Sequence, residues 1–472
     1  MRSARSAGPT GTVSATEIPG LLVVELTVRG DNRGWFKESW QRTKMVADGL
    51  PDFSPVQNNV SFNTAAGVTR GIHAEPWDKY VTVASGRVFG AWVDLRPGPT
   101  FGVAVTLEVG PDRAVFVPRG VGNAFQTLED ATAYSYLVND HWSAAGRDSY
   151  TFLNLADETV AIDWPIPLAQ AELSDADRDH PRLAQVRPMA PRPMLVVGAA
   201  GQLGRALTAT FPYAVAVGRG VLDLADPGSV AGFDFSPYGT IINAAAYTGV
   251  DAAETPTGRL EAWATNVTGL GAVVEAARRH RATLVHVSSD YVFDGTRARH
   301  PEDEPLSPLG VYGQTKAAGD ALVATLPRHL LLRTSWVVGE GRNFVTTMAG
   351  LADRGVSPSV VADQHGRLTL TLELVRALRH LLETDAAPGT YNVSNAGPVQ
   401  TWADIAREVF ALRGRDPDDV TPVTTEAYGA GKRLAPRPRH SDLDLAKLEA
   451  TGFVPEDATV ALRRYLGGSS TS

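Results

Sequence analysis

The stretch MLVVGAAGQLGRAL, residues Met194 to Leu207, places an apolar run directly before a cluster of glycines. Gly198, Gly201 and Gly204 follow this run at the point where a helical pattern begins. Glycines at such a turn allow a tight bend, close approach of a diphosphate to the backbone, and close packing of a helix on a strand. The spacing is GxxGxxG rather than GxGxxG, so this stretch alone also fits an ordinary glycine-rich turn between a strand and a helix.

The pattern of a strand followed by a helix continues to the C-terminal side of this stretch. Apolar runs such as TIINAAA, TLVHVSS and HLLLRTSWVV alternate with helical stretches such as NVTGLGAVVEAARRH. Strands that alternate with helices predict a parallel sheet covered by helices on both faces. We therefore expect an α/β dinucleotide-binding domain over residues 194–472.

The long first part of the chain has a different pattern. Between about residues 20 and 165, short β-rich runs such as LLVVELTV and YVTVASGRVFGAWVDL are separated by Gly, Pro and Asp. This spacing predicts an all-β sandwich or barrel. The segment RPMAPRP has three prolines in seven residues, which favours a semi-rigid connector. We predict a disordered leader (1–16), a β domain (17–185), a Pro-rich linker (186–193) and the α/β domain (194–472).

Composition excludes several classes of protein. The chain has 472 residues, 43% of them hydrophobic, which suffices for at least two cores. A formal charge of −8 argues against a nucleic-acid partner, and no apolar run reaches the roughly 18 residues of a membrane span. With no cysteine, the chain has neither disulfides nor cysteine-ligated metals, which is consistent with a cytoplasmic enzyme. The N-terminal MRSARSAGPTGTVSATEIPG lacks the apolar region of a signal peptide.

Three later motifs point to hydride transfer in the α/β domain. NAAAYTGVDAAE puts three alanines at a strand end, where small side chains leave room for a cofactor, and VHVSSDYVFDG ends another strand in hydroxyls. VYGQTK places Tyr312 and Lys316 four residues apart, on one face of a helix. A phenol normally titrates near pH 10, and a fixed ammonium beside it would lower that pKa. The pair therefore predicts a proton donor that works at neutral pH.

These motifs carry a resemblance to a known family. Residues 194 to about 468 resemble extended short-chain dehydrogenases, most closely dTDP-4-dehydrorhamnose reductase, through AAYTGVDAAE, SSDYVFDG, YGQTK, LRTSWVVGEGRNFVTTM, VADQHGRLT, GTYNVSN and APRPRHSDLDLAKL. The resemblance implies a Rossmann fold with a small C-terminal substrate subdomain. It also implies that Tyr312 protonates the C4 carbonyl oxygen as hydride arrives, that Ser289 hydrogen-bonds this oxygen, and that Lys316 holds the nicotinamide ribose.

The same resemblance implies the remaining binding residues. The cofactor positions are Gly198, Gly201, Gln202, Leu203, Gly204, Arg219, Asp223, Leu224, Ala244, Ala245, Ala246, Ser288, Tyr312 and Lys316. Val250, Tyr291 and Trp336 fall on positions that contact the sugar. Arg219 stands where an NAD-selective enzyme more often has an acidic residue, which favours NADPH and leaves NADH as the alternative.

Polar residues within the β domain indicate a second site. GVTRGIHAEPWDKY gathers Arg70, His73 and Lys79 within ten residues at the start of a β-rich run. PRGVGNAF has the P-x-G turn of cupin barrels, but Asn123 stands where metal-binding cupins carry histidine. Only His73, His141 and His180 are available in this domain, and their spacing gives no support to a three-histidine metal centre. A metal-free barrel is the better interpretation.

Residues 17 to 185 resemble dTDP-4-dehydrorhamnose 3,5-epimerase, which implies a cupin-like jelly-roll barrel. The motifs are DNRGWFKES, QNNVSFNTAAGVTRGIH, KYVTVASGRVFGAWVDLR, PTFG, YSYLVNDHW, IDWPIP and LSDAD. The resemblance implies that His73 is the base at the carbons beside the C4 ketone, with Asp177 as its dyad partner. Tyr136 would return a proton from the opposite face, and Lys79 would stabilise the enolate oxygen. Nucleotide, diphosphate or base contacts are implied for Arg33, Glu38, Gln57, Asn59, Arg70 and Trp142.

The β domain departs from the family pattern near His73. Only AEPWD separates His73 from Lys79, and Ala74 and Glu75 replace an aromatic-glutamine pair. Trp142 occupies a position that usually holds tyrosine, and its indole retains the ability to stack on a base or sugar. These changes leave open whether both C3 and C5 are epimerised.

Together the two resemblances imply a bifunctional enzyme. It would convert dTDP-4-dehydro-6-deoxy-D-glucose to dTDP-L-rhamnose by 3,5-epimerisation and then NADPH-dependent reduction at C4. The expected partners are this dTDP-ketosugar and a second copy of the chain, joined through the barrels. Two alternatives stay open: an antibiotic deoxysugar pathway such as that of dihydrostreptose, and a reductase whose barrel only binds nucleotide sugar.

Overall fold

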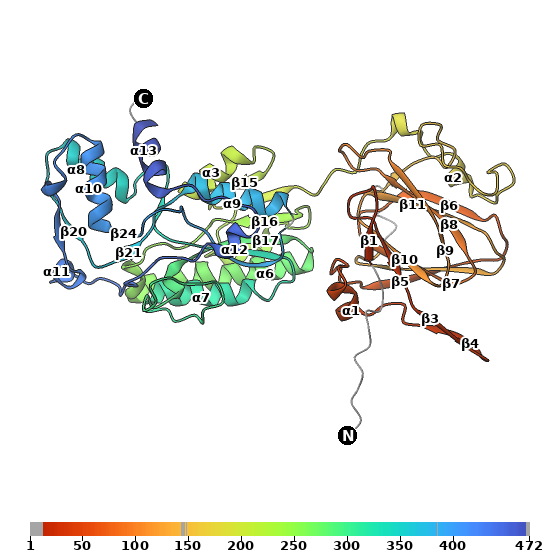
Figure 1. Cartoon of the computed structure of the whole chain (residues 1–472), viewed down its shortest axis with the longest axis horizontal. Coiled ribbons are helices and arrows are strands. Elements are labelled where there is room, and N and C mark those ends of the chain that lie inside the picture. Colours follow the sequence, from red (N-terminus) through yellow and green to blue (C-terminus); the bar gives the residue numbers. More distant parts are fainter. Residues whose placement is uncertain (1–12, 143–146, 148, 385, 469–472) are drawn as a thin grey trace, which may run out of the picture. The chain divides into compact units, whose positions relative to one another are not determined.

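The computed structural model describes residues 13–142, 147, 149–384 and 386–468. The chain divides into two compact units, residues 1–191 and 192–472. Figure 1 shows β-strands in the first unit and alternating strands and helices in the second. None of the described helices combines the length and apolar character that crossing a membrane requires.

The first unit is the expected jelly-roll barrel, built from two antiparallel sheets. One sheet has the order β1-β2-β10-β7-β12-β5, with bounds Val13–Ala15, Leu22–Glu25, Arg113–Val117, Lys79–Ser85, Thr132–Val138 and Gln57–Asn63. The other has the order β13-β6-β11-β8-β9, with bounds Thr151–Phe152, Thr69–Ala74, Val121–Thr127, Val88–Asp94 and Ala104–Val109. A separate hairpin is formed by β3 (Val28–Asp31) and β4 (Gly34–Lys37).

The barrel core lies between the two sheets and includes Val81, Trp92, Val115 and Phe125. Along β5, half-buried and exposed side chains alternate, as expected for a strand with one covered face. Two short helices, α1 (Arg42–Ala47) and α2 (Asp175–Arg178), complete the unit.

The structure differs from the sequence-based expectation at the end of the leader. Residues 1–12 of the expected leader lie outside the described residues, but Val13–Ala15 form β1 because they pair with β2 in antiparallel register. The division between the two units falls within the expected linker, and each end of that segment contacts its own unit. Met189 is buried and donates its backbone N–H to Leu95 O at 2.8 Å, while Pro193 O accepts from Gly239 N at 2.9 Å.

The second unit contains a parallel six-stranded sheet of order β15-β14-β16-β17-β18-β23. The strands span Val215–Val217, Met194–Val197, Thr240–Asn243, Thr283–Ser289, His329–Thr334 and Gly389–Asn392. Alternate residues of β14 face opposite sides. Leu195 and Val197 pack with residues of α6 (Leu270–Arg279), whereas Val196 packs with residues of α3 (Gln202–Thr210) and α9 (Thr371–Glu383). Burial of both faces explains the near-continuous apolar strands.

A smaller subdomain near the C-terminus has its own core, as the resemblance implied. Val345, Phe410 and Leu462 pack together within it. Its helices are α8 (Phe344–Asp353), α10 (Trp402–Leu412), α11 (Thr425–Gly429) and α13 (Ala458–Gly468). Three two-stranded sheets join them: β19 (Val337–Val338) with β22 (Thr369–Leu370), β20 (Ser359–Val361) with β25 (Thr421–Val423), and β21 (His365–Gly366) with β24 (Gln400–Thr401).

Candidate active sites

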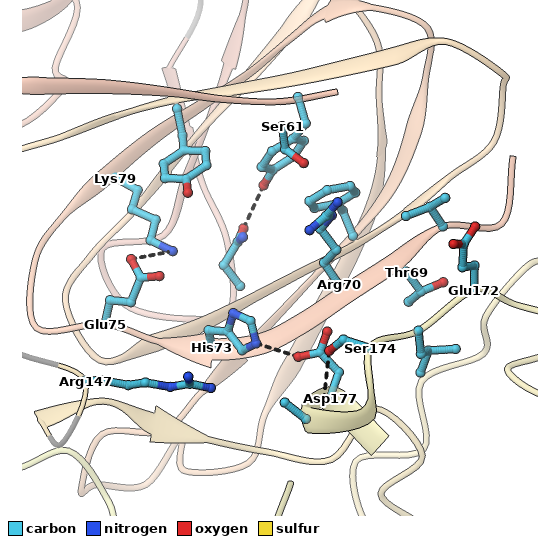
Figure 2. Close-up of a pocket in the computed structure, with 17 residues that line it drawn as sticks. Ser61, Thr69, Arg70, His73, Glu75, Lys79, Arg147, Glu172, Ser174 and Asp177 are labelled. Carbon is cyan, nitrogen blue, oxygen red and sulfur yellow. Dashed lines mark hydrogen bonds and ion pairs between the residues drawn. The ribbon is translucent and has the colours of Figure 1, made fainter. Parts of the chain in front are cut away.

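The barrel encloses a pocket of about 510 Å³ between its two sheets. Strands β6 and β11 of the five-stranded sheet and β5, β7 and β12 of the six-stranded sheet contribute side chains to its lining. The lining includes His73, Asp177, Tyr136 and Lys79, so the four residues predicted to be catalytic in this domain meet in one cavity. Figure 2 shows His73 directed at Asp177, with Lys79 and Glu75 paired nearby.

His73 and Asp177 form a hydrogen-bonded pair across 104 residues of sequence, with His73 Nε2 at 2.8 Å from Asp177 Oδ1. Asp177 is held in the first turn of α2, where its backbone N–H donates to the N-cap residue Ser174 at 3.1 Å. Burial raises the pKa of Asp177, but the hydrogen bond and charge of His73 outweigh burial and the pKa lies below its usual value. Because an ionised carboxylate only accepts, we assign the proton of neutral His73 to Nε2, which leaves Nδ1 as the basic atom.

Tyr136 and Lys79 come from the other sheet. Lys79 Nζ lies 5.4 Å from the centre of the Tyr136 ring and 2.8 Å from Glu75 Oε2. Burial and, next, the charge of Glu75 raise the pKa of Tyr136 to about 12, so its hydroxyl keeps its proton at neutral pH. The pocket therefore has a proton acceptor on one side and a proton donor on the other.

The predicted substrate-binding residues lie in three places. Arg70 lines the pocket and donates to Asn63 Oδ1 at 3.1 Å. Gln57 and Asn59 are hydrogen-bonded neighbours on β5, and Gln57 accepts from the backbone of the exposed Trp142 at 3.2 Å. Arg33 and Glu38 lie on or beside the β3–β4 hairpin, outside the pocket lining of their own barrel, where they pair with Asp31 and Lys44.

The glycine-rich turn lies at the switch point of the parallel sheet. The chain order reverses between β14 and β16, and ligands of open α/β sheets bind beyond the strand ends at such a point. Gly198 has φ +85°, and a Cβ there would lie 2.6 Å from Ala245 N. A Cβ on Gly204 would lie 2.1 Å from Gly198 O, so α3 packs directly on the turn. This backbone cradle, open at the N-terminus of α3, fits the diphosphate of a dinucleotide.

The other predicted cofactor residues surround this cradle. Gln202 and Leu203 begin α3, and Ser288 is buried near the end of β17. Ala244, Ala245 and Ala246 directly follow β16, and all three are half-buried. Arg219 follows β15 and is exposed, while Asp223 and the buried Leu224 lie in the next loop. An exposed guanidinium at this strand end suits the 2′-phosphate of NADPH.

Ser289, Tyr312 and Lys316 lie where β17 ends and α7 (Val311–Val323) begins. Burial and, next, the charge of Asp290 raise the pKa of Tyr312 to about 12, although a hydrogen bond with Ser289 opposes the rise. Lys316 Nζ lies 2.8 Å from Val287 O and 3.2 Å from His286 Nε2. The lowering of the Tyr312 pKa by Lys316 that the sequence predicted is therefore not found in this structure. Burial dominates, and Lys316 also has its pKa lowered, to about 8.

The predicted sugar-contacting residues lie in two places. The Tyr291 ring meets the Tyr312 ring edge-on at 5.5 Å, and Val250 lies in the loop after β16. Trp336 belongs to the smaller subdomain, where it stacks on Trp402 at 3.8 Å. Tyr291 thus lies against the predicted proton donor Tyr312, whereas Trp336 belongs to a different core.

Sequence reasoning missed several residues that shape the two sites. Glu75 was noted only as a departure from the epimerase family pattern, although its carboxylate forms an ion pair with Lys79. Asn266 lies in the π-helical turn 264–269 and bridges Tyr247 O and Thr315 Oγ1 at 3.1 and 3.0 Å. The others are His180 beside Asp177, His286 beneath Lys316, and Arg437, which hydrogen-bonds Tyr291. A polar residue within an apolar strand, such as His286 in LVHVSS, was the available signal.

Comparison with known proteins assigns each of the two units to a family. A family model described as dTDP-4-dehydrorhamnose 3,5-epimerase matches residues 15–185, and one described as RmlD substrate binding domain matches residues 192–469. The chain belongs to both families. We refer to residues 1–191 as the epimerase unit and to residues 192–472 as the RmlD unit.

Individual relatives agree with this assignment. The epimerase unit is similar to the Protein RmlC homolog of Streptococcus pyogenes serotype M6, with 50% identity over 37% of this chain and 91% of that protein. The RmlD unit is similar to a probable dTDP-4,6-dihydroxy-2-methyloxan-3-one 4-ketoreductase of Streptomyces antibioticus, with 39% identity over 57% of this chain and 92% of that protein. A dTDP-4-dehydrorhamnose reductase structure from Bacillus anthracis, in complex with NADP, has 32% identity and a TM-score of 0.54 over 59% of this chain and 99% of that chain.

Proposed function

We propose that the chain converts dTDP-4-dehydro-6-deoxy-D-glucose to dTDP-L-rhamnose in two steps. The epimerase unit inverts C3 and C5, and the RmlD unit then reduces C4 with NADPH. The observation that carries the proposal is the placement of His73 and Tyr136 on opposite sheets of one pocket. Inversion of a carbon requires removal of a proton from one face and return of a proton to the other, which this arrangement supports.

In the epimerase unit, the reaction begins at a carbon beside the C4 ketone. Nδ1 of His73 takes the proton from that carbon, while the Asp177 carboxylate stabilises the imidazolium that forms. Negative charge develops on the C4 oxygen, where the Lys79 ammonium offsets it. Tyr136 then donates its proton to the opposite face of the carbon. Exchange with water then removes the proton from His73 and returns one to Tyr136, after which the second carbon beside the ketone is inverted in the same way.

In the RmlD unit, the chain's residues orient the ketone and supply a proton. When bound, NADPH supplies the hydride for C4. The glycine turn of β14 and α3 would hold the diphosphate, Arg219 the 2′-phosphate, and Lys316 the nicotinamide ribose. Ser289 hydrogen-bonds the C4 oxygen, and Tyr312 donates its proton to that oxygen. Reduction comes last because it removes the ketone that makes the C3 and C5 protons acidic.

Reductase turnover is expected to fall as pH rises above about 8. The pKa of Lys316 lies at about 8, so the ammonium is present below this pH and lost above it. The charged fraction then falls about tenfold for each further pH unit. The measurement is kcat for reduction of pre-epimerised substrate between pH 6 and pH 10 (roughly two units either side of that pKa). Lys316→Arg, which stays charged, should show no such fall, and a flat wild-type profile would contradict the prediction.

The test of the whole function uses the purified chain, dTDP-4-dehydro-6-deoxyglucose and NADPH. NADPH loss is followed optically and the product is identified by NMR. We expect dTDP-L-rhamnose without any added enzyme. NADPH oxidation that starts only when a separate epimerase is added would mean that the barrel binds sugar without catalysing its epimerisation.

A second candidate is the reduction of a related ketosugar in an antibiotic deoxysugar pathway. It is favoured by the 39% identity to the ketoreductase of Streptomyces antibioticus and by the replacement of an aromatic-glutamine pair by Ala74 and Glu75. The same NMR experiment separates the two candidates. A 6-deoxyhexose with a single inverted centre would favour this second function.

We also propose that the epimerase unit forms a homodimer through β5. Among the described residues, β5 is an edge strand of its sheet and pairs with β12 alone. Its Val60 and Phe62 are 63% and 61% exposed. On the β3–β4 hairpin, Phe36 is 71% exposed. Apolar side chains on an unpaired edge strand are typical of an interface rather than of a free surface. In such a dimer, Arg33 and Glu38, which lie on or beside the β3–β4 hairpin, would contact the partner's substrate.

Phe62→Lys is expected to convert the dimer to a monomer. A charge placed on the apolar face of β5 must be desolvated when two copies meet. The mass in solution is measured by light scattering across a concentration series. Leu260→Lys in the RmlD unit is the matched control, because Leu260 is 73% exposed and lies outside the proposed interface. A wild-type chain that is monomeric throughout the series, or a Phe62→Lys dimer, would contradict the interface.

A further inference from the structure

One carboxylate oxygen in the epimerase unit lies between two imidazoles. Asp177 Oδ1 is 2.8 Å from His73 Nε2 and 3.9 Å from His180 Nδ1. The two rings meet edge-on, with centroids 5.3 Å apart. The fold thus assembles two histidines and an aspartate, rather than the three histidines of a cupin metal centre.

His180 is held in one orientation. Its ring stacks on Phe152 with centroids 4.7 Å apart and planes inclined by 24°. It also donates a hydrogen bond to the backbone carbonyl of Gly71, and its side chain is only 8% exposed. Since Nδ1 is buried without a hydrogen-bond partner, the donor is Nε2. A neutral ring that donates from Nε2 presents a lone pair at Nδ1.

That lone pair of His180 lies 3.9 Å from a carboxylate oxygen of Asp177, so two acceptor atoms are held close together with room for a cation between them. Ligand atoms of His73, Asp177 and His180 all lie within 4.8 Å of one another. Two imidazole nitrogens and one carboxylate oxygen are a donor set that suits Zn²⁺, Co²⁺ or Ni²⁺ rather than Mg²⁺ or Ca²⁺. The hydrogen bond from His180 to Gly71 is the kind of backbone contact that orients metal-binding histidines.

We propose that His73, Asp177 and His180 form an inhibitory site for a divalent transition-metal ion such as Zn²⁺. Binding at His73 Nε2 displaces the proton shared with Asp177, and the ring keeps a proton at Nδ1 instead. Nδ1 is the atom that removes the substrate proton, so the metal-bound barrel has no base. The inhibition rests on the proposed function, whereas the binding itself does not.

The charges nearby favour reversible binding over a permanent metal. Arg147 lines the same pocket, and its guanidinium lies 5.8 Å from the centre of the Phe152 ring. This positive charge opposes a second cation beside His180. With three protein ligands, an ion would also keep a coordination position for water or for an oxygen of the substrate.

The test uses the full chain, without a histidine tag and stripped of metal with a chelator. Co²⁺ is titrated in while its visible absorption is recorded, and the Zn²⁺ affinity is measured by competition. We expect one ion per chain. His180→Phe keeps a flat ring against Phe152 and removes the nitrogen, and it should weaken binding at least about tenfold. His180→Gln serves if the Phe variant does not fold, and His141→Phe, which changes an exposed histidine of the same unit, should bind as wild type does.

Activity is measured in parallel. Zn²⁺ should slow epimerisation by the wild type, a chelator should restore it, and reduction of pre-epimerised substrate should be unaffected. Equal affinity in wild type and His180→Phe, or no bound ion, would overturn the site. Binding without slower epimerisation would overturn the inhibition. If metal-free wild type shows no epimerisation, the proposed function fails, while the Co²⁺ titration still decides the metal site.

Discussion

Replacing His73 by Asn is expected to lower the rate of epimerisation by about 10²- to 10⁴-fold, the usual contribution of a general base. The Asn side chain offers no basic atom in place of Nδ1, and it is too short to reach Asp177 as His73 Nε2 does. The measurement is exchange of the C3 and C5 protons of the ketosugar for deuterium, followed by NMR in D₂O. This readout needs no NADPH, so it reports on the epimerase unit alone.

Tyr136→Phe is the matched control for this experiment. It removes the donor on the opposite sheet and leaves the His73–Asp177 pair intact, so exchange through His73 should persist while inversion slows. Both variants should reduce pre-epimerised substrate at the wild-type rate, which shows that the RmlD unit is folded. Wild-type deuterium exchange in His73→Asn would mean that a different group removes the protons, and the barrel mechanism would be wrong.

The fold of the RmlD unit could be predicted because its signals are local. The glycines after β14 and the alternation of strands and helices are each contained within a few tens of residues. In contrast, Asp177 reaches His73 across 104 residues, and no spacing rule connects them. Only the resemblance to a family indicated that pair. His180, which the sequence presents as one histidine in a charged tail, was not indicated even by the resemblance.

Burial explains why the pKa values of Tyr312 and Lys316 differ from those expected from the sequence. The spacing of Tyr312 and Lys316 is correctly read as one face of α7, which fits a phenol with an ammonium beside it. Lys316 is buried and Tyr312 is half-buried, however, and removal from water moves the pKa of each toward its neutral form. A sequence gives the identity and order of titratable groups but not the amount of protein around them. The same limit applies to Asn123, which stands in the sequence where metal-binding cupins carry a histidine ligand. In the structure, Asn123 Oδ1 accepts hydrogen bonds from Trp92 and Tyr134, each at 2.9 Å.

The end of the leader was placed too late for a related reason. Short polar stretches such as VSAT have weak local preferences, so a leader and a strand can have similar sequences. Pairing with β2 forms a strand at Val13–Ala15, so a contact with a distant segment overrides what the local residues favour.

Replacing Tyr312 by Phe is expected to lower reductase turnover by about 10²- to 10⁴-fold. The hydroxyl is the only group removed, and the ring keeps its edge-on contact with Tyr291 at 5.5 Å. Because the pKa of Tyr312 is about 12, the wild-type hydroxyl is protonated at neutral pH and ready to donate. Without it, the alkoxide that forms at C4 has no positioned proton donor. The measurement is kcat on pre-epimerised substrate, together with NADPH affinity from fluorescence, which should change little.

Tyr291→Phe provides the comparison that makes this prediction specific. Tyr291 lies beside Tyr312 and hydrogen-bonds Arg437, so its hydroxyl is expected to orient the sugar rather than to donate the proton. Its loss should raise KM more than it lowers kcat, whereas Tyr312→Phe should lower kcat with little effect on KM. Deuterium exchange by the epimerase unit should be normal in both variants. If Tyr312→Phe retains more than about a tenth of wild-type turnover, a different group donates the proton, since general acid catalysis is worth at least about a hundredfold.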